Sequence, residues 1–183
     1  MKRGVYLMAI VSALLMWGRG EAQRFSSRGL TYKAPRVEWA DSVMATLDLE
    51  QRIAQLMIAR VPARMDKEQE EAYVQMVEGY GLGGVCFFAG TTEGQMALTR
   101  ELQGRAKVPL LVSMDAEWGL GMRLKDQYSF PRNARFGQLA PEADSLVFQL
   151  GAEIGRQCRA VGVHINFAPV VDINSNPLNP VIG

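Results

Sequence analysis

Short apolar runs and stretches of helical periodicity alternate along most of the chain. The short runs are dominated by Val, Ile, Leu and Phe, as are strands buried on both faces of a parallel sheet. Three such strands are predicted, over residues 85–88, 109–114 and 163–171. Stretches with apolar residues at helical spacing lie between them. Strands that alternate with helices predict a parallel sheet in an α/β fold, either open or closed into a barrel.

Local signals mark the ends of the predicted helices. Asp48 with Gln51 three residues later is typical of a capping box, in which each residue bonds the backbone of the other. The apolar stripe that follows predicts a helix that reaches Arg60 and ends before Pro62. The other helices are expected over 65–77, from Thr91 or Thr92 to about Gln103, and from near Pro141 to Gly162.

A glycine run before the first predicted strand matches a nucleotide-binding pattern only literally. Gly79, Gly81 and Gly84 have the spacing G-x-G-x-x-G. A dinucleotide loop follows a strand and opens a helix, whereas these glycines follow a helix and open a strand. We interpret them as a tight helix-to-strand turn, and we expect no cofactor.

The first 22 residues have a pattern of their own. Lys2 and Arg3 precede an apolar run over 5–17, and Gly20-Glu-Ala22 follows with small residues two apart. This pattern is typical of a secretory signal peptide, and the run is shorter than the roughly 20 residues that span a bilayer. We expect cleavage after Ala22, export to the periplasm or the extracellular space, and no stable membrane anchor. Residues 23–40 then form a linker or irregular lead-in, and 41–183 form the domain.

Composition excludes several partners. The 183 residues, 48% of them hydrophobic, suit one globular domain, and the net charge of +1 gives no general attraction to nucleic acid. Cys86 and Cys158 lie among apolar neighbours and are expected to be buried as small hydrophobes, although a disulfide between them stays open. No spacing of Cys and His suggests a metal site.

Candidate chemistry follows the predicted strand over 109–114. The strand ends at Asp115, and Glu117, two glycines and Arg123 come next. The carboxyl ends of strands are where α/β folds bind ligands. Asp accepts two hydroxyl hydrogen bonds and Arg offers a rigid fork of donors, so the pattern favours a site for a polyhydroxylated ligand. A structural alternative stays open, in which Asp115 caps a turn and Arg123 pairs with Glu117 on the surface.

Two other polar residues receive structural interpretations. His164 is the only histidine and lies within a predicted strand, where we expect it to be packed and hydrogen-bonded. A lone histidine does not build a Ser-His-Asp triad or a zinc site without further partners. Asp172 ends the third predicted strand and is expected to orient a loop rather than to touch substrate.

Six stretches resemble the N-terminal domain of glycoside hydrolase family 3, in the order in which that family carries them. They are Leu47-Asp-Leu-Glu-Gln-Arg-Ile-Ala-Gln-Leu56, Gly81-Leu-Gly-Gly-Val85, residues 108–117, Phe130-Pro131, residues 162–172 and Asn179-Pro-Val-Ile-Gly183. The resemblance implies the N-terminal portion of a (β/α)8 TIM-type barrel. It also implies an exo-acting, retaining hydrolase whose substrate is a carbohydrate with a terminal β-linked sugar. By the same resemblance, Asp115 holds hydroxyls of that sugar.

The branch of the family is read from the residues after Asp115. The β-N-acetylhexosaminidase branch, which this chain resembles most, usually reads Asp-Gln-Glu-Gly-Gly-Arg and has a substrate-binding Arg that corresponds to Arg123. Here Glu117 is kept, but Trp118 and Leu120 replace Gly and Arg. A β-glucosidase or a β-xylosidase stays an alternative, and β-glucosidases usually read Asp-Ala-x-His-Gly at this position. A non-catalytic secreted sugar-binding remnant also stays an alternative. Trp118 either stacks on a sugar or packs under the loop.

The resemblance also implies groups that this sequence lacks. A retaining glycosidase needs a nucleophile and an acid/base on either side of the scissile bond. In the family these follow later, so both are expected beyond Gly183 and no residue here is assigned a catalytic role. About three of eight barrel strands are predicted. We therefore expect a fragment or a truncated gene product, inactive as 183 residues alone.

Overall fold

The computed structural model describes residues 38–61, 65–173, 175–176 and 178–179. The predicted signal peptide over 1–22 lies outside the described residues, as does the predicted linker up to residue 37. Residues 38–40 begin helix α2 (Glu38–Thr46), so helical structure starts three residues before the boundary expected at Asp41. Within the described ranges, no helix combines the length and apolar character that crossing a membrane requires.

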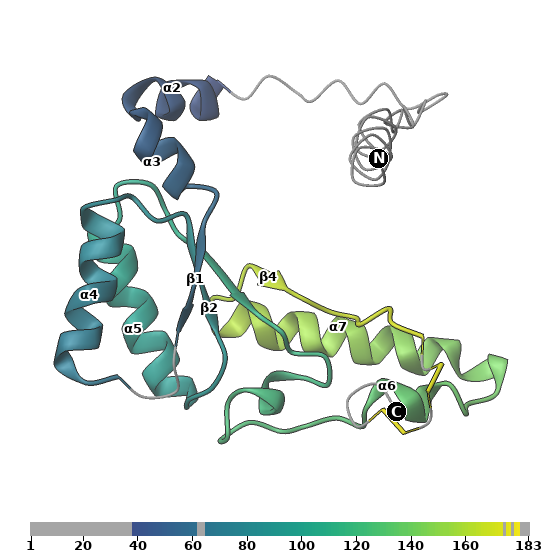
Figure 1. Ribbon diagram of the computed structural model, residues 1–183. Helices are drawn as coiled ribbons and strands as arrows, with labels where there is room; N and C mark the ends of the chain where they lie inside the picture. Colours follow the sequence, from purple (N-terminus) through teal and green to yellow (C-terminus); the bar gives the residue numbers. More distant parts are fainter. Residues whose placement is uncertain (1–37, 62–64, 174, 177, 180–183) are drawn as a thin grey trace, which may run out of the picture. The chain divides into compact units, whose positions relative to one another are not determined.

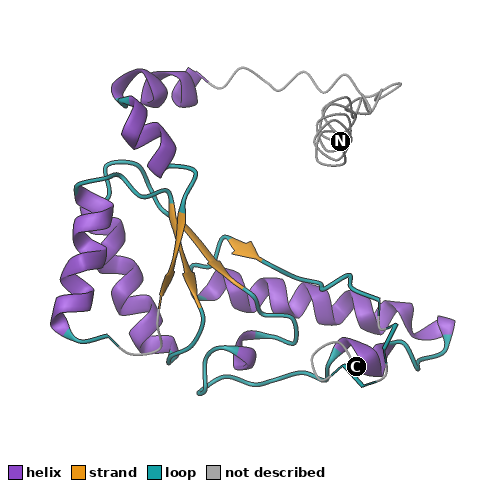
Figure 2. Ribbon diagram, viewed as in Figure 1, coloured by secondary structure: helices purple, strands orange, loops and turns teal. Residues whose placement is uncertain are grey.

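A parallel sheet of four strands is the centre of the fold (Figure 2). Its order is β1-β2-β3-β4, so strands that follow one another in the chain also lie side by side. This order, with helices between the strands, confirms the predicted α/β fold with a parallel sheet. The strands are β1 (Ile58–Val61), β2 (Gly84–Phe87), β3 (Leu111–Met114) and β4 (Ile165–Asn166).

Three of the described helices begin at a side-chain cap, namely α3 (Leu49–Ala54), α4 (Lys67–Glu78) and α5 (Thr92–Arg105). Asp48 and Gln51 form the predicted capping box, and Thr91 accepts a hydrogen bond from the Gly94 amide to cap the next long helix. Asp66 forms a second capping box that the sequence reading missed. The remaining helices are η1 (Leu120–Met122), α6 (Asn133–Phe136), η2 (Pro141–Ala143) and α7 (Asp144–Ala160).

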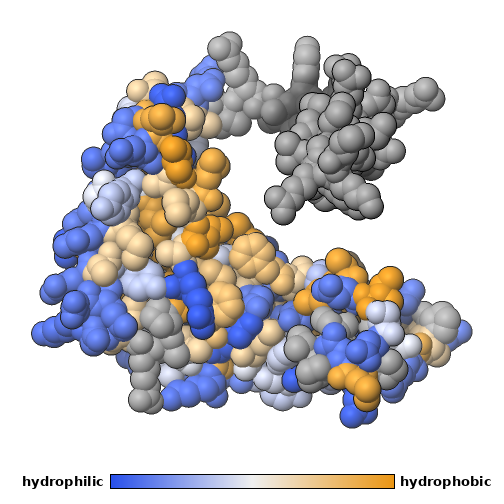
Figure 3. All heavy atoms as spheres, in the orientation of Figure 1, coloured by the Kyte–Doolittle hydropathy of each residue, from blue (hydrophilic) through white to orange (hydrophobic). Residues whose placement is uncertain are grey.

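The first strand corrects a prediction. The apolar periodicity favours one helix from Asp48 to Arg60, but α3 ends at Ala54 and β1 begins at Ile58. The Gly83 amide donates to the Ala54 carbonyl at 2.9 Å, and β1 then pairs with β2. These bonds to a distant segment outweigh the local helical preference. The predicted stripe does not face a core, since Leu49, Ile53, Leu56 and Met57 are all exposed. Apolar side chains accordingly form part of the surface over α3 (Figure 3).

Helices α4, α5 and α7 cover one face of the sheet (Figure 1). Side chains alternate between the two faces of a strand. On one face of the sheet, the strand side chains pack with side chains of α4, α5 and α7 in a single buried cluster. The core residues on this face are Val61, Val85, Phe87, Val112 and Met114 from the strands, and Val77, Leu102, Ile154 and Cys158 from the helices. The opposite face is the one that a closed barrel turns inward.

The turn between α4 and β2 requires glycine. Gly81 has a φ of 72°, in the left-handed region that other residues avoid. A Cβ on Gly83 would lie 2.0 Å from the backbone oxygen of Gln55, a distance that no side chain tolerates. The predicted role of the glycine run as a helix-to-strand turn is therefore confirmed, because it follows α4 and opens β2.

The last predicted strand is shorter than expected. The apolar run over 163–171 forms only the two-residue β4, and Phe167 and Val171 are exposed. Among the described strands β4 pairs only with β3, and Pro169 has no N–H to extend the pairing. His164, just before β4, is hydrogen-bonded as predicted, since its Nδ1 accepts from the Val112 amide at 3.0 Å. The packing expected of His164 is wrong, because the residue is exposed.

Both cysteines behave as predicted. Cys86 in β2 and Cys158 in α7 are buried, and neither forms a disulfide. Burial raises the pKa of the Cys158 thiol, which keeps it protonated and unreactive near neutral pH.

Candidate functional site

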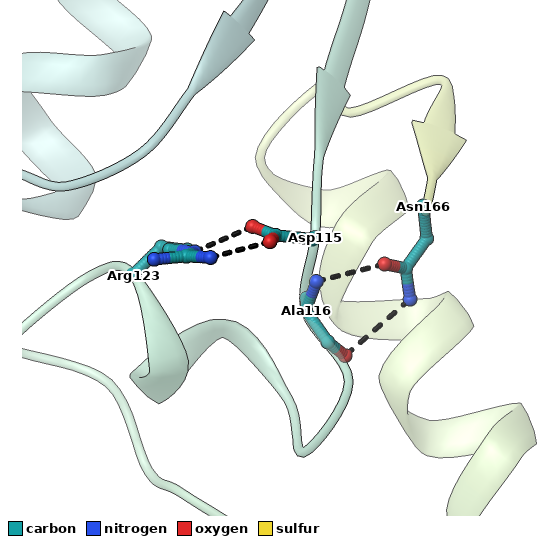
Figure 4. Close-up of polar contacts among 4 residues, drawn as sticks. All are labelled: Asp115, Ala116, Arg123 and Asn166. Atoms are coloured by element: carbon teal, nitrogen blue, oxygen red, sulfur yellow. Dashed lines mark hydrogen bonds and ion pairs between the residues drawn. The ribbon is translucent and has the colours of Figure 1, made fainter. Parts of the chain in front are cut away.

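Asp115 and Arg123 form a bidentate ion pair at the C-terminal end of β3 (Figure 4). Nε and Nη2 of Arg123 donate to the two carboxylate oxygens of Asp115. The side chains are partly buried, 22% exposed for Arg123 and 24% for Asp115. Parallel hydrogen bonds between a guanidinium and a carboxylate fix orientation as well as charge. The structure thus joins the two predicted site residues and contradicts the surface pair of Arg123 with Glu117.

The loop between them folds back onto a later segment. Gly119 has a φ of 89°, and a Cβ there would lie 2.8 Å from the Phe130 ring. The Phe130 amide donates to the Trp118 carbonyl at 2.8 Å, and the Gly121 amide donates to the Tyr128 carbonyl at 3.2 Å. The two glycines therefore let the chain turn tightly enough to bring Arg123 back to the end of β3.

Asn166 of β4 holds the backbone of Ala116, the residue that follows Asp115 (Figure 4). Its Oδ1 accepts from the Ala116 amide at 2.8 Å, and its Nδ2 donates to the Ala116 carbonyl at 3.4 Å. The amide side chain replaces the backbone partner that a longer strand would provide. Sequence reasoning missed this residue. The available signal was a polar amide inside a largely apolar predicted strand.

A second set of bonds fixes the far end of the loop to the start of α5. The Gly90 amide donates to the Arg123 carbonyl at 3.0 Å, and the Lys125 amide donates to the Gly90 carbonyl at 3.1 Å. The Asp126 carboxylate accepts from the Thr92 amide at 3.0 and 3.1 Å. This backbone hydrogen bond is the main reason why the pKa of Asp126 is lowered from its ordinary value of 3.8. Arg123 is therefore anchored through its own backbone.

Two arginines contact one aromatic ring at this end of the sheet. Phe88 directly follows β2, and the Cζ atoms of Arg60 and Arg123 lie 4.9 and 5.0 Å from its ring centroid. Guanidinium groups at such distances are attracted by the negative face of the ring. Arg60 comes from β1, in a segment that the sequence reading assigned to a helix, so its place at this edge was not foreseen.

The remaining candidates lie around the same loop or beyond it. The Arg132 Cζ is 4.9 Å from the centroid of the Trp118 ring, which leaves only the other ring face for a sugar. Glu117 is partly exposed. Asp172 is exposed, and within the described part of the chain its side chain forms no hydrogen bond that would orient a loop.

Comparisons with known proteins cover most of the chain. The sequence model of the Glycosyl hydrolase family 3 N terminal domain matches residues 48–183. Beta-hexosaminidase A of Pseudoalteromonas piscicida is 33% identical over 119 residues, which are 59% of this chain and 20% of that protein. Beta-hexosaminidase LpqI of Mycobacterium tuberculosis is 31% identical over 151 residues, 77% of this chain and 35% of that protein. The chain thus spans only 20% and 35% of these relatives' lengths.

A solved structure supports the same fold. The beta-glucoside phosphorylase BglX bound to 2FGlc matches with a TM-score of 0.65 and 22% identity, over 78% of this chain and 25% of that chain. The parallel strands in chain order are the N-terminal portion of the family's TIM-type barrel, with four described strands where the sequence predicted three. Asp115 and Arg123 both lie inside the matched residues. Because the match extends over most of its length, the chain belongs to glycosyl hydrolase family 3 through that family's N-terminal domain.

Proposed function

We propose that the protein is a retaining, exo-acting glycoside hydrolase that releases terminal β-linked N-acetylhexosamine. In this proposal the Asp115–Arg123 pair holds the terminal sugar. The observation that carries it is the bidentate pair at the C-terminal end of a strand in a family 3 domain. Sequence relatives named beta-hexosaminidases support the choice of sugar.

The pair has the chemistry that a sugar hydroxyl needs. Each carboxylate oxygen of Asp115 accepts one N–H from Arg123 and keeps further lone-pair capacity. A guanidinium has five N–H donors, and only two of those of Arg123 go to Asp115. A hydroxyl both donates and accepts, so it can bond to both members of the pair at once. Partial burial of both side chains strengthens such bonds relative to water.

Asp115 is given a binding role rather than a reacting one. Positive charge develops on the sugar ring in the transition state, and a nearby carboxylate stabilises it more than it stabilises the ground state. Retention also requires a nucleophile and an acid/base, which we place beyond Gly183 in line with the family resemblance. On this proposal the 183 residues bind the terminal sugar but do not hydrolyse a glycoside.

The test compares three aryl glycosides with protein expressed from its complete gene. We expect the N-acetyl-β-glucosaminide to exceed the β-glucoside and the β-xyloside in kcat/KM by at least about tenfold, a discrimination that a site built to hydrogen-bond one substituent reaches. NMR of the first product formed should show the β-anomer. The opposite order of rates would indicate the β-glucosidase or β-xylosidase alternative. Binding of N-acetylglucosamine without any hydrolysis would indicate a non-catalytic sugar-binding protein.

Export is a separate part of the proposal. It rests on the charged start, the apolar run over 5–17 and the small residues that end at Ala22. N-terminal sequencing of the protein from its native cells should begin at or near Gln23. An intact Met1 on protein recovered from the cytoplasm would contradict export without affecting the proposed activity.

A further inference from the structure

Arg60 lies on the inner face of the sheet, at the C-terminal end of β1. In the strand register it stands beside Cys86 of β2. Because side chains alternate along a strand, Arg60 shares a face with Phe88, two positions after Cys86. Asp115 shares that face too, since it lies two positions after Ser113, the partner of Cys86 in β3. This is the face opposite to the helices, which a TIM-type barrel turns toward its mouth.

The two arginines that contact Phe88 differ in whether a carboxylate neutralises their charge. Arg123 gives two hydrogen bonds to the Asp115 carboxylate. The guanidinium of Arg60 forms no ion pair or hydrogen bond with any residue in 38–61 or 65–173, and its Cζ lies 4.9 Å from the centroid of the Phe88 ring. Contact with an aromatic ring orients a guanidinium, but the N–H donors in the plane of the guanidinium stay available for hydrogen bonds. Arg60 is therefore an exposed positive charge whose N–H donors have no hydrogen-bond partner among the described residues.

The backbone of Arg60 is held in place. Its carbonyl accepts a hydrogen bond from the Tyr73 hydroxyl of α4, and the neighbouring Val61 is buried in the core. When an arginine lies on a strand and its guanidinium contacts an aromatic ring, it loses less conformational freedom on binding a ligand than an arginine on a loop does. The planar fork of a guanidinium matches the two oxygens of a carboxylate or a phosphate.

We propose that Arg60 binds an oxyanion beside the Asp115–Arg123 pair. The oxyanion is either a charged substituent of the glycoside, such as a carboxylate, or a free anion such as inorganic phosphate. The location of the sugar in this inference rests on the proposed function. Asp115 neutralises Arg123, whereas Arg60, which makes the other contact to Phe88, has no carboxylate partner among the described residues.

The experiment uses two aryl N-acetyl-β-glucosaminides that differ in charge, and the ratio of their rates in each variant is compared with the ratio in wild type, which cancels the difference between the leaving groups. One carries a 4-carboxyphenyl group and the other the neutral, nearly isosteric 4-carbamoylphenyl group. In wild-type protein from the complete gene we expect kcat/KM to favour the carboxylate by about two- to fivefold, the upper range for an exposed ion pair. Arg60→Gln should abolish the preference, so that the charged and the neutral glycoside have similar kcat/KM. Arg100→Gln on the outer helix α5, which removes the same charge from an exposed residue, should change neither rate.

A second arm distinguishes the free anion. Hydrolysis of the neutral glycoside is measured in phosphate and in chloride at equal ionic strength. If the ligand is a free anion, phosphate changes the wild-type rate, and Arg60→Gln removes that change. Arg60→Lys should restore part of either effect, because it keeps the charge but not the planar fork.

Each outcome decides the inference separately from the proposed function. If Arg60→Gln lowers both glycoside rates equally, or if neither charge nor phosphate matters in wild-type protein, the inference is wrong although the hydrolase proposal stands. If wild-type protein hydrolyses neither glycoside, the hydrolase proposal fails. Calorimetric binding of the 4-carboxyphenyl glycoside to wild-type and Arg60→Gln protein then tests the anion site alone. Equal affinities would overturn it.

Discussion

Replacing Asp115 with Asn separates a sugar-binding role from a structural one. The amide has the same size but carries no charge, and its NH2 group would face N–H donors of Arg123, so one of the two bonds between the side chains is lost. The pair is partly exposed, and its loss should destabilise the fold by about 1 kcal/mol. In a protein of this size that lowers the melting temperature by about 2–4 °C.

The expected loss of activity is much larger. Hydrogen bonds to a charged group contribute about 1.5–3 kcal/mol each, and Asp115 has the free lone pairs to make two with sugar hydroxyls. Weakening both together should lower kcat/KM by about 10²- to 10⁴-fold, because the charge matters most in the transition state. Adding Arg123→Gln should cost far less than the product of the two single effects, since the side chains act as one unit.

The assay combines kinetics on an aryl N-acetyl-β-glucosaminide with thermal melting. Asp172→Asn is the matched control, because Asp172 also follows an apolar strand run but is exposed and forms no described side-chain hydrogen bond. It should keep activity within about threefold, as surface substitutions usually do. Full activity in Asp115→Asn would mean that the carboxylate only caps a turn. A melting temperature that collapses together with activity would mean that its role is structural.

Three further changes test how the site is held. Asn166→Ala leaves two partly buried backbone groups without their partner and should destabilise the protein by about 1–3 kcal/mol, with a loss of activity, in chemical unfolding and kinetics. Gly83→Ala places a Cβ 2.0 Å from the Gln55 oxygen and should prevent folding or cost about 3 kcal/mol or more, whereas Gly104→Ala, with open space around it, should be neutral or stabilising by circular dichroism melts. The lowered pKa of Asp126 means that its carboxylate stabilises the fold above pH 3.8 and loses that effect as the pH falls through the lowered value. The difference in melting temperature between wild type and Asp126→Ala should therefore be constant near neutral pH and shrink below pH 3.8; a difference independent of pH would refute this linkage.

Local signals predicted the parts of the fold that depend on neighbours in the sequence. The capping box at Asp48, the cap at Thr91 and the turn at Gly81 and Gly83 each need only a few adjacent residues, and the structure has all of them. The position of Asp115 at the end of a strand followed from the apolar run before it.

Features that depend on distant partners were beyond the same reasoning. The stripe from Leu49 to Met57 fits a helix as well as it fits a short helix followed by β1, and only pairing with β2 decides between them. The loop after Asp115 is long enough to bring Arg123 to either acidic residue. Asn166 reaches Ala116 from 50 positions away, a contact that no local pattern encodes.

The central claim is that the Asp115–Arg123 pair holds the terminal sugar of the substrate. The most direct measurement is a crystal structure of the protein from its complete gene, soaked with N-acetylglucosamine. We predict ring hydroxyls within about 3 Å of both the carboxylate and the guanidinium, at the C-terminal end of β3. A sugar bound elsewhere in the barrel mouth, with the pair untouched, would contradict the claim.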